Sequence, residues 1–131
     1  MTQRRKVFKT KSFARWSRKN LPDALLCVAA REIEQGLFEA DLGGGVCKKR
    51  IALPGRGKSG STRTLVAKRH KNAVFFLEGR EKSERGADFS ASEEELAKII
   101  ARSLQLADAR TLEQLTAVGV QTEICNEQEG D

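Results

Sequence analysis

Apolar positions in the first third of the chain recur at helical spacing. Residues 11–19 are predicted to form a short helix with Phe13 and Trp16 on one face. On that face we expect Trp16 to be a core anchor rather than a platform for base stacking. A second helix is predicted to start with Pro22 at its first position and to end at Gly36. Its buried stripe comprises Leu25, Leu26, Ala29, Ala30 and Ile33.

The middle of the chain has the pattern of an antiparallel meander. Three strands are predicted, at residues 46–53, 63–69 and 73–79. The polar turn 70–72 joins the last two, and the continuous apolar run 74–77 is typical of a central strand that is buried on both faces. The three glycines at 43–45 are predicted to form a flexible break before the sheet. Residues 7–10 are either a short strand or an extended lead-in.

The C-terminal third is predicted to be mainly helical. A helix begins at Ser92, which has Glu95 three positions later in the spacing of a capping box. Its apolar face comprises Leu96, Ile99, Ile100 and Leu104. Thr111 begins a shorter helix carrying Leu112, Leu115 and Val118, and residues 120–125 could add an edge strand. The last residues, 126–131, are predicted to be a flexible acidic tail of a single domain spanning 1–131.

Charge is distributed unevenly along the 131 residues. Residues 1–85 carry a net charge of +13 and residues 86–131 a net charge of −7, which together give +6. A basic body favours an anionic partner, and the acidic third suggests a second surface. A pattern that serves only solubility would look similar, so the charge alone does not identify a nucleic-acid-binding protein.

Cysteine and hydrophobic patterns exclude several classes of protein. The three cysteines, Cys27, Cys47 and Cys125, are widely spaced, and no CxxC motif is present. We therefore expect neither a disulfide framework nor a zinc site. The same pattern fits a protein of the reducing cytoplasm. No apolar run reaches the roughly 20 residues of a membrane helix. The basic N-terminus is not followed by an apolar segment, which argues against a signal peptide.

Three familiar kinds of site chemistry do not fit the sequence. The segment Gly57-Lys58-Ser59 resembles the end of a P-loop, but Ala52 occupies the position of the required first glycine. Nucleophilic catalysis would need His70 as a base, and we expect this only histidine to be solvated in its lysine-rich turn. Paired carboxylates such as Glu93 and Glu94 stand at a helix start, where they complement the dipole.

The most basic stretch of the chain runs from Cys47 to Arg63 and contains no acidic residue. Its glycines and cations suit the binding of phosphate. RNA can be cut without metal or histidine, because its own 2′-hydroxyl can attack the adjacent phosphate. The protein must stabilise the extra negative charge and help proton transfer. Arginine supplies bidentate donors to phosphoryl oxygens, and a lysine crowded by other cations has a lowered pKa. From the residues alone, a basic surface that only binds is at least as well supported as a nuclease.

Three segments, 8–19, 42–67 and 75–84, resemble the RelE/HigB-type toxins of bacterial toxin–antitoxin systems. The motifs are K-x-R at 48–50, then P-G-x-G-K-x-G-x-x-R at 54–63, then G-x-x-K-S-E at 79–84. The end of the chain, 115–125, resembles the tail of the same subgroup. The resemblance implies an α+β fold: an antiparallel sheet of three to four strands, two N-terminal helices and one or two C-terminal helices.

The resemblance also implies a function and a site. Such toxins are metal-independent endoribonucleases that cleave mRNA in the ribosomal A site, inhibit translation, need no cofactor and are silenced by a cognate antitoxin. By the same resemblance, the expected catalytic residues are Arg63 for transition-state charge, with Lys58 and Lys82 for phosphate and proton transfer. The expected RNA-binding residues are Lys48, Lys49, Arg50, Arg56 and Arg80.

The sequence departs from the subgroup at three positions. Ser61 replaces the second loop glycine, Thr62 replaces an aromatic residue, and Glu78 stands where tyrosine is common. The chain has no tyrosine, and Phe89 could stack on a base but not donate a hydroxyl. An alternative is therefore a catalytically degenerate homologue that binds antitoxin or RNA. A gyrase-poisoning toxin of the same fold is a third alternative, which the dense basic loop argues against.

Overall fold

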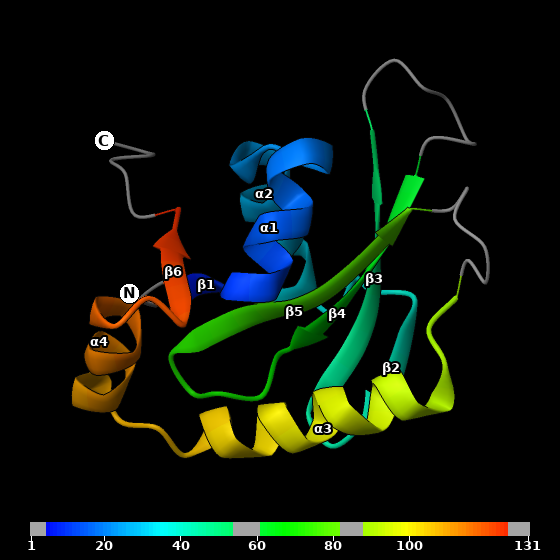
Figure 1. The fold of residues 1–131 in the computed structure, drawn as a ribbon. Helices are drawn as coiled ribbons and strands as arrows, with labels where there is room; N and C mark the ends of the chain where they lie inside the picture. Colours follow the sequence, from blue (N-terminus) through cyan, green and yellow to red (C-terminus); the bar gives the residue numbers. More distant parts are fainter. Residues whose placement is uncertain (1–4, 54–60, 82–87, 126–131) are drawn as a thin grey trace.

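A computed structural model describes residues 5–53, 61–81 and 88–125. The ten helices and strands of these residues confirm the α+β class (Figure 1). In chain order they are β1 (Lys6–Thr10), α1 (Lys11–Asn20), α2 (Asp23–Glu34), β2 (Ala40–Gly43), β3 (Val46–Ala52), β4 (Ser61–Ala67), β5 (Ala73–Glu81), α3 (Ala91–Gln105), α4 (Ala109–Ala117) and β6 (Gln121–Ile124).

The sheet is larger than predicted and is mixed. Its six described strands lie in the order β2-β3-β4-β5-β1-β6. The antiparallel meander β3-β4-β5 is confirmed, but β1 pairs with β5 in parallel and β6 pairs with β1 antiparallel. The glycines at 43–45 are not a break: all three have positive φ and close the hairpin between β2 and β3. The prediction of three to four antiparallel strands missed β2, because the glycines that close its hairpin were interpreted as a break. It did not place the two terminal strands, because β1 pairs with strands that are far from it in the sequence.

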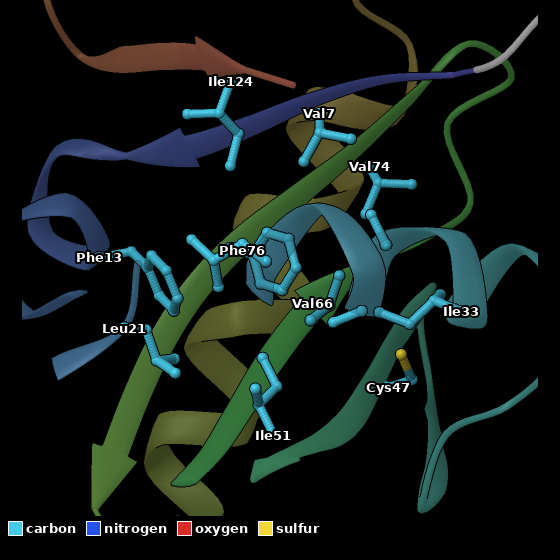
Figure 2. Packing of buried hydrophobic residues seen from close by; sticks show 13 residues of the cluster. Val7, Phe13, Leu21, Ile33, Cys47, Ile51, Val66, Val74, Phe76 and Ile124 are labelled. Atoms are coloured by element: carbon cyan, nitrogen blue, oxygen red, sulfur yellow. The ribbon is translucent and has the colours of Figure 1, made fainter. Parts of the chain in front are cut away.

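Two layers of helix cover the sheet. Figure 1 shows α1 and α2 on one face and α3 on the other, with α4 beside β6. Figure 2 shows the core between the first pair of helices and the sheet, where Phe13 and Phe76 meet with ring centroids 5.4 Å apart. A second apolar cluster, which includes Phe75 and Leu65, lies on the α3 face. Residues Ala73–Leu77 of β5 are all buried, which confirms the prediction of a central strand.

The starts of three helices differ slightly from the predicted positions. Pro22 is the N-cap of α2 and not its first helical residue. The capping box of α3 uses Ser90 and Glu93, two residues before the predicted pair, because both serines have a glutamate three positions later. Asp108 accepts the hydrogen bond from Thr111 N at the start of α4, so Thr111 is inside the helix.

The buried face of α3 was also predicted in the wrong orientation. Ala97 and Ala101 are buried against the sheet, whereas the side chains of Leu96 and Ile99 are 54% and 63% exposed. Ile100 and Leu104 do contact the core. The helix is rotated toward its alanines because small side chains allow closer approach to the sheet, and hydrophobicity alone gave them too little weight.

Cys27 and Cys125 form a disulfide, contrary to the expectation of free thiols. Cys27 lies on α2 and Cys125 follows β6, and their Cα atoms are 5.7 Å apart. The pairing was invisible in the sequence because 98 positions separate the two residues. Cys47 is free and buried, and burial raises the pKa of its thiol to about 12.

His70 is buried, whereas the sequence analysis predicted a solvated side chain. Its ring is 6% exposed and contacts Phe75 edge-on, with centroids 5.8 Å apart. The Asn72 N–H donates to Nδ1, so Nε2 carries the proton and donates to the Ala107 carbonyl oxygen at 2.8 Å. His70 therefore joins the 70–72 turn to the segment before α4, and it takes no part in the basic surface described next.

Candidate functional site

A row of three arginines crosses the middle of the sheet. Arg50 of β3 pairs with Arg63 of β4, and Arg63 pairs with Arg80 of β5. Residues directly opposite one another in a sheet project from the same face, and neighbouring strands are about 4.8 Å apart. The backbone positions of the three arginines therefore lie within roughly 10 Å of one another, on the face covered by α3. Like charges placed directly opposite destabilise a sheet unless nearby negative charge offsets them.

A second row lies next to the arginines on the same face. Leu65 of β4 pairs with Lys48 of β3 on one side and with Glu78 of β5 on the other. A register shift between Leu65 and Val66 leaves Leu77 unpaired with β4, and both Leu77 and Glu78 then belong to the α3 face. The two rows together place four cations and one carboxylate around a buried leucine. We name these residues, Lys48, Arg50, Arg63, Glu78 and Arg80, the basic face.

The start of α3 brings carboxylates onto the basic face. Lys48 Nζ donates to both carboxylate oxygens of Asp88 at 2.9 Å and lies 3.4 Å from Glu94 Oε2. Arg80 forms an ion pair with Glu93 and donates to the Asp88 carbonyl oxygen at 3.2 Å. The sequence assigned Glu93 and Glu94 only to a helix start. The change of charge sign after residue 85 was the available signal that these acids could oppose the basic residues.

These contacts shift the pKa values of the groups involved. Hydrogen bonding to Lys48 is the main cause that lowers the pKa of Asp88, with Phe89 N–H and the charge of Arg63 adding to it. Burial alone would lower the pKa of Lys48, but its bonds to Asp88 and Glu94 outweigh burial and raise it. Lys48 is thus held in its charged form. The expectation that crowded cations lower a lysine pKa here does not apply to this residue.

Glu78 differs from the other carboxylates of this surface. Its pKa is raised, mainly by burial and then by the charge of Glu93, while Arg80 acts in the opposite direction. Within the described residues Glu78 forms no hydrogen bond or ion pair, because Arg80 is directed to Glu93 and to the Asp88 carbonyl. A half-buried carboxylate with raised pKa on a cationic surface is a marker of a functional site.

The side chain of Phe89 packs in the core. Its side chain is 7% exposed within the apolar cluster under α3. The guanidinium of Arg80 lies over its ring, 5.4 Å from the centroid. Phe89 therefore orients Arg80 and does not offer a free ring for stacking on a nucleobase.

The structure separates Lys49 from the other predicted RNA-binding residues. Its side chain points to the opposite face of the sheet, is 8% exposed, and donates to the Leu37 carbonyl oxygen at 2.9 Å. It also forms an ion pair with Glu32 of α2 at 2.8 Å. Alternation along β3 puts Lys48 and Arg50 on one face and Lys49 on the other. The predicted residues Arg56, Lys58 and Lys82 lie outside the described residues.

The described residues show neither a metal site nor a membrane helix. They contain no cluster of three or more His, Cys, Asp or Glu side chains that could hold a metal. None of their helices is long and apolar enough to cross a membrane. A cavity of about 430 Å³ lies at the other end of the fold, between α4, β1 and the His70 turn, and no residue of the basic face lines it.

Comparison with known proteins identifies one family. The model of the family described as RelE toxin of RelE / RelB toxin-antitoxin system matches residues 5–124. The match covers all the helices and strands described above. No curated protein matches the chain significantly.

Proposed function

The chain belongs to the RelE toxin family, and from this premise we propose that it is an endoribonuclease that cleaves mRNA in the ribosomal A site and so inhibits translation. Membership implies the toxin of a toxin–antitoxin system, with an antitoxin as partner. We also propose that cleavage depends on the ribosome, needs no metal and is of the HigB type. The cytoplasmic location is proposed from the toxin family alone, because the Cys27–Cys125 disulfide removes the argument from the cysteine pattern.

The observation that carries this proposal is the row Arg50–Arg63–Arg80. A single-stranded RNA carries one phosphate per nucleotide, so a line of guanidinium groups suits its backbone. Arg63 is central in the row, and guanidinium donors stabilise a phosphoryl group whose negative charge increases in the transition state. We therefore assign transition-state stabilisation to Arg63, with Arg50 and Arg80 binding the phosphates on either side.

The other residues predicted from the sequence are assigned separate functions in RNA binding and cleavage. Lys48, which stays charged, is proposed to bind phosphate and not to transfer protons. Lys58 and Lys82 remain proposed for phosphate binding and proton transfer, and Arg56 for RNA binding. Lys49 is left out of the proposed interface because its bonds to Leu37 and Glu32 hold it on the other face.

The first experiment is primer extension on an mRNA incubated with purified protein, with and without programmed ribosomes. Cuts that need ribosomes would support the proposal, and cuts on free mRNA would indicate a general ribonuclease. Arg63→Ala should abolish the cuts while the circular dichroism spectrum stays unchanged. Arg110→Ala, which removes an exposed arginine of α4, is the matched control and should cleave normally. If Arg63→Ala cleaves like the control, the assignment of Arg63 is wrong.

A non-catalytic binder is the second candidate. The observation in its favour is that Asp88, Glu93 and Glu94 already pair with Lys48 and Arg80, which lowers the positive charge offered to RNA. Such a protein would bind its antitoxin tightly and leave mRNA intact in both arms of the primer-extension experiment. Folded wild-type protein that binds antitoxin and makes no cuts would establish this alternative.

A further inference from the structure

We propose that Glu78 is the general base of the reaction, which accepts the proton of the attacking 2′-hydroxyl on the basic face. This inference rests on the proposed ribonuclease function and identifies a residue for its proton-transfer step. It starts from the second row of the basic face, where Glu78 and Lys48 flank Leu65 beside the three arginines.

The position of Glu78 fits contact with a reacting nucleotide. Its strand neighbour on the same face, Arg80, belongs to the arginine row that is proposed to bind phosphates. Because Arg63 pairs with Arg80, Glu78 is a diagonal cross-strand neighbour of Arg63, and such neighbours on one face are about 7–8 Å apart. A phosphate held by Arg63 would thus place its adjacent ribose within reach of the Glu78 carboxylate.

The other described groups of this face are poor proton acceptors. Arginine stays protonated at any pH that proteins tolerate, and the pKa of Lys48 is raised. Asp88 and Glu94 are bonded to Lys48, and Glu93 is bonded to Arg80. Glu78 alone among these carboxylates forms no hydrogen bond or ion pair with any described residue, so its oxygens remain available.

The surroundings of Glu78 also tune its basicity. Three charged groups share its part of the face: Arg80 on its own strand, Arg63 on β4, and Glu93 from α3. Burial and Glu93 together outweigh Arg80 and raise its pKa, which makes the carboxylate a stronger base than an exposed glutamate. Glutamate is also uncommon in strands, where β-branched and aromatic side chains pack better.

The step that we assign to Glu78 balances without a cofactor. The 2′-hydroxyl gives its proton to the Glu78 carboxylate while its oxygen forms a bond to phosphorus, and the bond from phosphorus to the 5′-oxygen breaks. The departing 5′-oxygen takes a proton from solvent or from a cationic side chain. The products are a 2′,3′-cyclic phosphate and a 5′-hydroxyl end, and the protonated Glu78 returns its proton to water.

The test compares Glu78→Gln, Glu78→Asp and wild type in single-turnover cleavage of mRNA on programmed ribosomes. Glutamine keeps the size of the side chain but cannot accept the proton, so the rate should fall on the order of 10²- to 10⁴-fold. Aspartate keeps a carboxylate and should recover at least about tenfold over glutamine. Glu113→Gln, an exposed change on α4, is the matched control and should cleave like wild type.

Two further measurements separate a base from a residue that only repels or only packs. Binding of ribosomes programmed with a 2′-deoxy-substituted mRNA should be unchanged or tighter in Glu78→Gln, because the variant loses a negative charge. The acidic limb of the wild-type pH–rate profile should disappear in that variant. Circular dichroism and thermal unfolding verify that each variant is folded.

The possible results distinguish a failure of the Glu78 proposal from a failure of the nuclease proposal. Cleavage by Glu78→Gln within about threefold of wild type, or faster than wild type, would overturn the role of Glu78 and leave the nuclease proposal standing. Loss of binding in parallel with the loss of rate would also overturn it. If the wild-type protein binds its antitoxin but makes no cuts, the nuclease proposal fails and the role of Glu78 fails with it.

Discussion

Replacing Gly79 by alanine should destabilise the fold, although alanine is the better residue for a strand. Gly79 lies on β5 between Glu78 and Arg80, and its α-carbon faces the ring of Trp16 on α1. A Cβ atom at this position would be 2.7 Å from Cη2 of Trp16 and closer still to Cζ3 and Cε3. Real Cβ atoms do not approach ring carbons so closely, so the indole must move.

Two opposing contributions set the size of the effect. Glycine in a strand costs roughly 0.5–1 kcal/mol relative to alanine, so alanine would stabilise by that amount if there were room. Displacing a packed aromatic side chain costs up to about 3–5 kcal/mol, and less when the side chain is partly exposed, as Trp16 is. Trp16 also loses its contact with Phe13, whose ring centroid is 5.5 Å away. We expect a net loss of about 2–3 kcal/mol in the free energy of unfolding.

Urea unfolding of four proteins measures this directly: wild type, Gly79→Ala, Trp16→Ala and the double variant. Once the indole is removed, the alanine at 79 meets no ring and should stabilise by about 0.5–1 kcal/mol. The double-mutant cycle should therefore give a coupling energy of about 3 kcal/mol. If Gly79→Ala is as stable as wild type, or if the two changes add without coupling, the close packing of Trp16 on β5 is refuted.

Three further predictions concern bonds elsewhere in the molecule. Cys27→Ser should lower the oxidised protein's free energy of unfolding by up to about 4–5 kcal/mol, because the bond to Cys125 closes a long loop. With a reductant present, wild type and variant should unfold at the same urea concentration. Asp88→Asn should cost less than about 1 kcal/mol at pH 7, since the ion pair with Lys48 is solvent-accessible. The native pKa of Asp88 is below its unfolded value near 3.8, so this stabilisation is present above pH 4 and is lost as the pH falls through the native pKa. A cost that does not decrease as the pH is lowered below 4 would contradict the ion pair. His70→Phe should cost about 2–4 kcal/mol in chemical denaturation, because two backbone groups lose their partners, and a change below 0.5 kcal/mol would show that the two hydrogen bonds contribute nothing.

The sequence determined the elements whose signals are local. Helical spacing of apolar residues located α1 and α2, and the buried run at Val74–Leu77 identified β5 as a central strand. The short polar turn at 70–72 indicated that β4 and β5 pair as antiparallel neighbours. Motif spacing within the chain also pointed to the family that the model of residues 5–124 matches.

Local patterns failed where the same residue spacing fits two alternative structures. Serines at 90 and 92 both have a glutamate three residues later, and the capping box formed at the first. Apolar residues recur around much of α3, so periodicity did not decide between the stripe with Leu96 and the stripe with Ala97. The fit of α3 against the sheet, which depends on volume, made that choice.

The tertiary structure alone decided which charges act together. Strand register brought Arg50, Arg63 and Arg80 into one row, and strand alternation removed Lys49 from it. Long-range pairing brought the acidic start of α3 onto Lys48 and Arg80, and it brought Cys27 to Cys125. Composition and spacing record which residues a chain contains, and only the folded backbone fixes distances between residues that are far apart in sequence. The electrostatics of the candidate site depend on those distances.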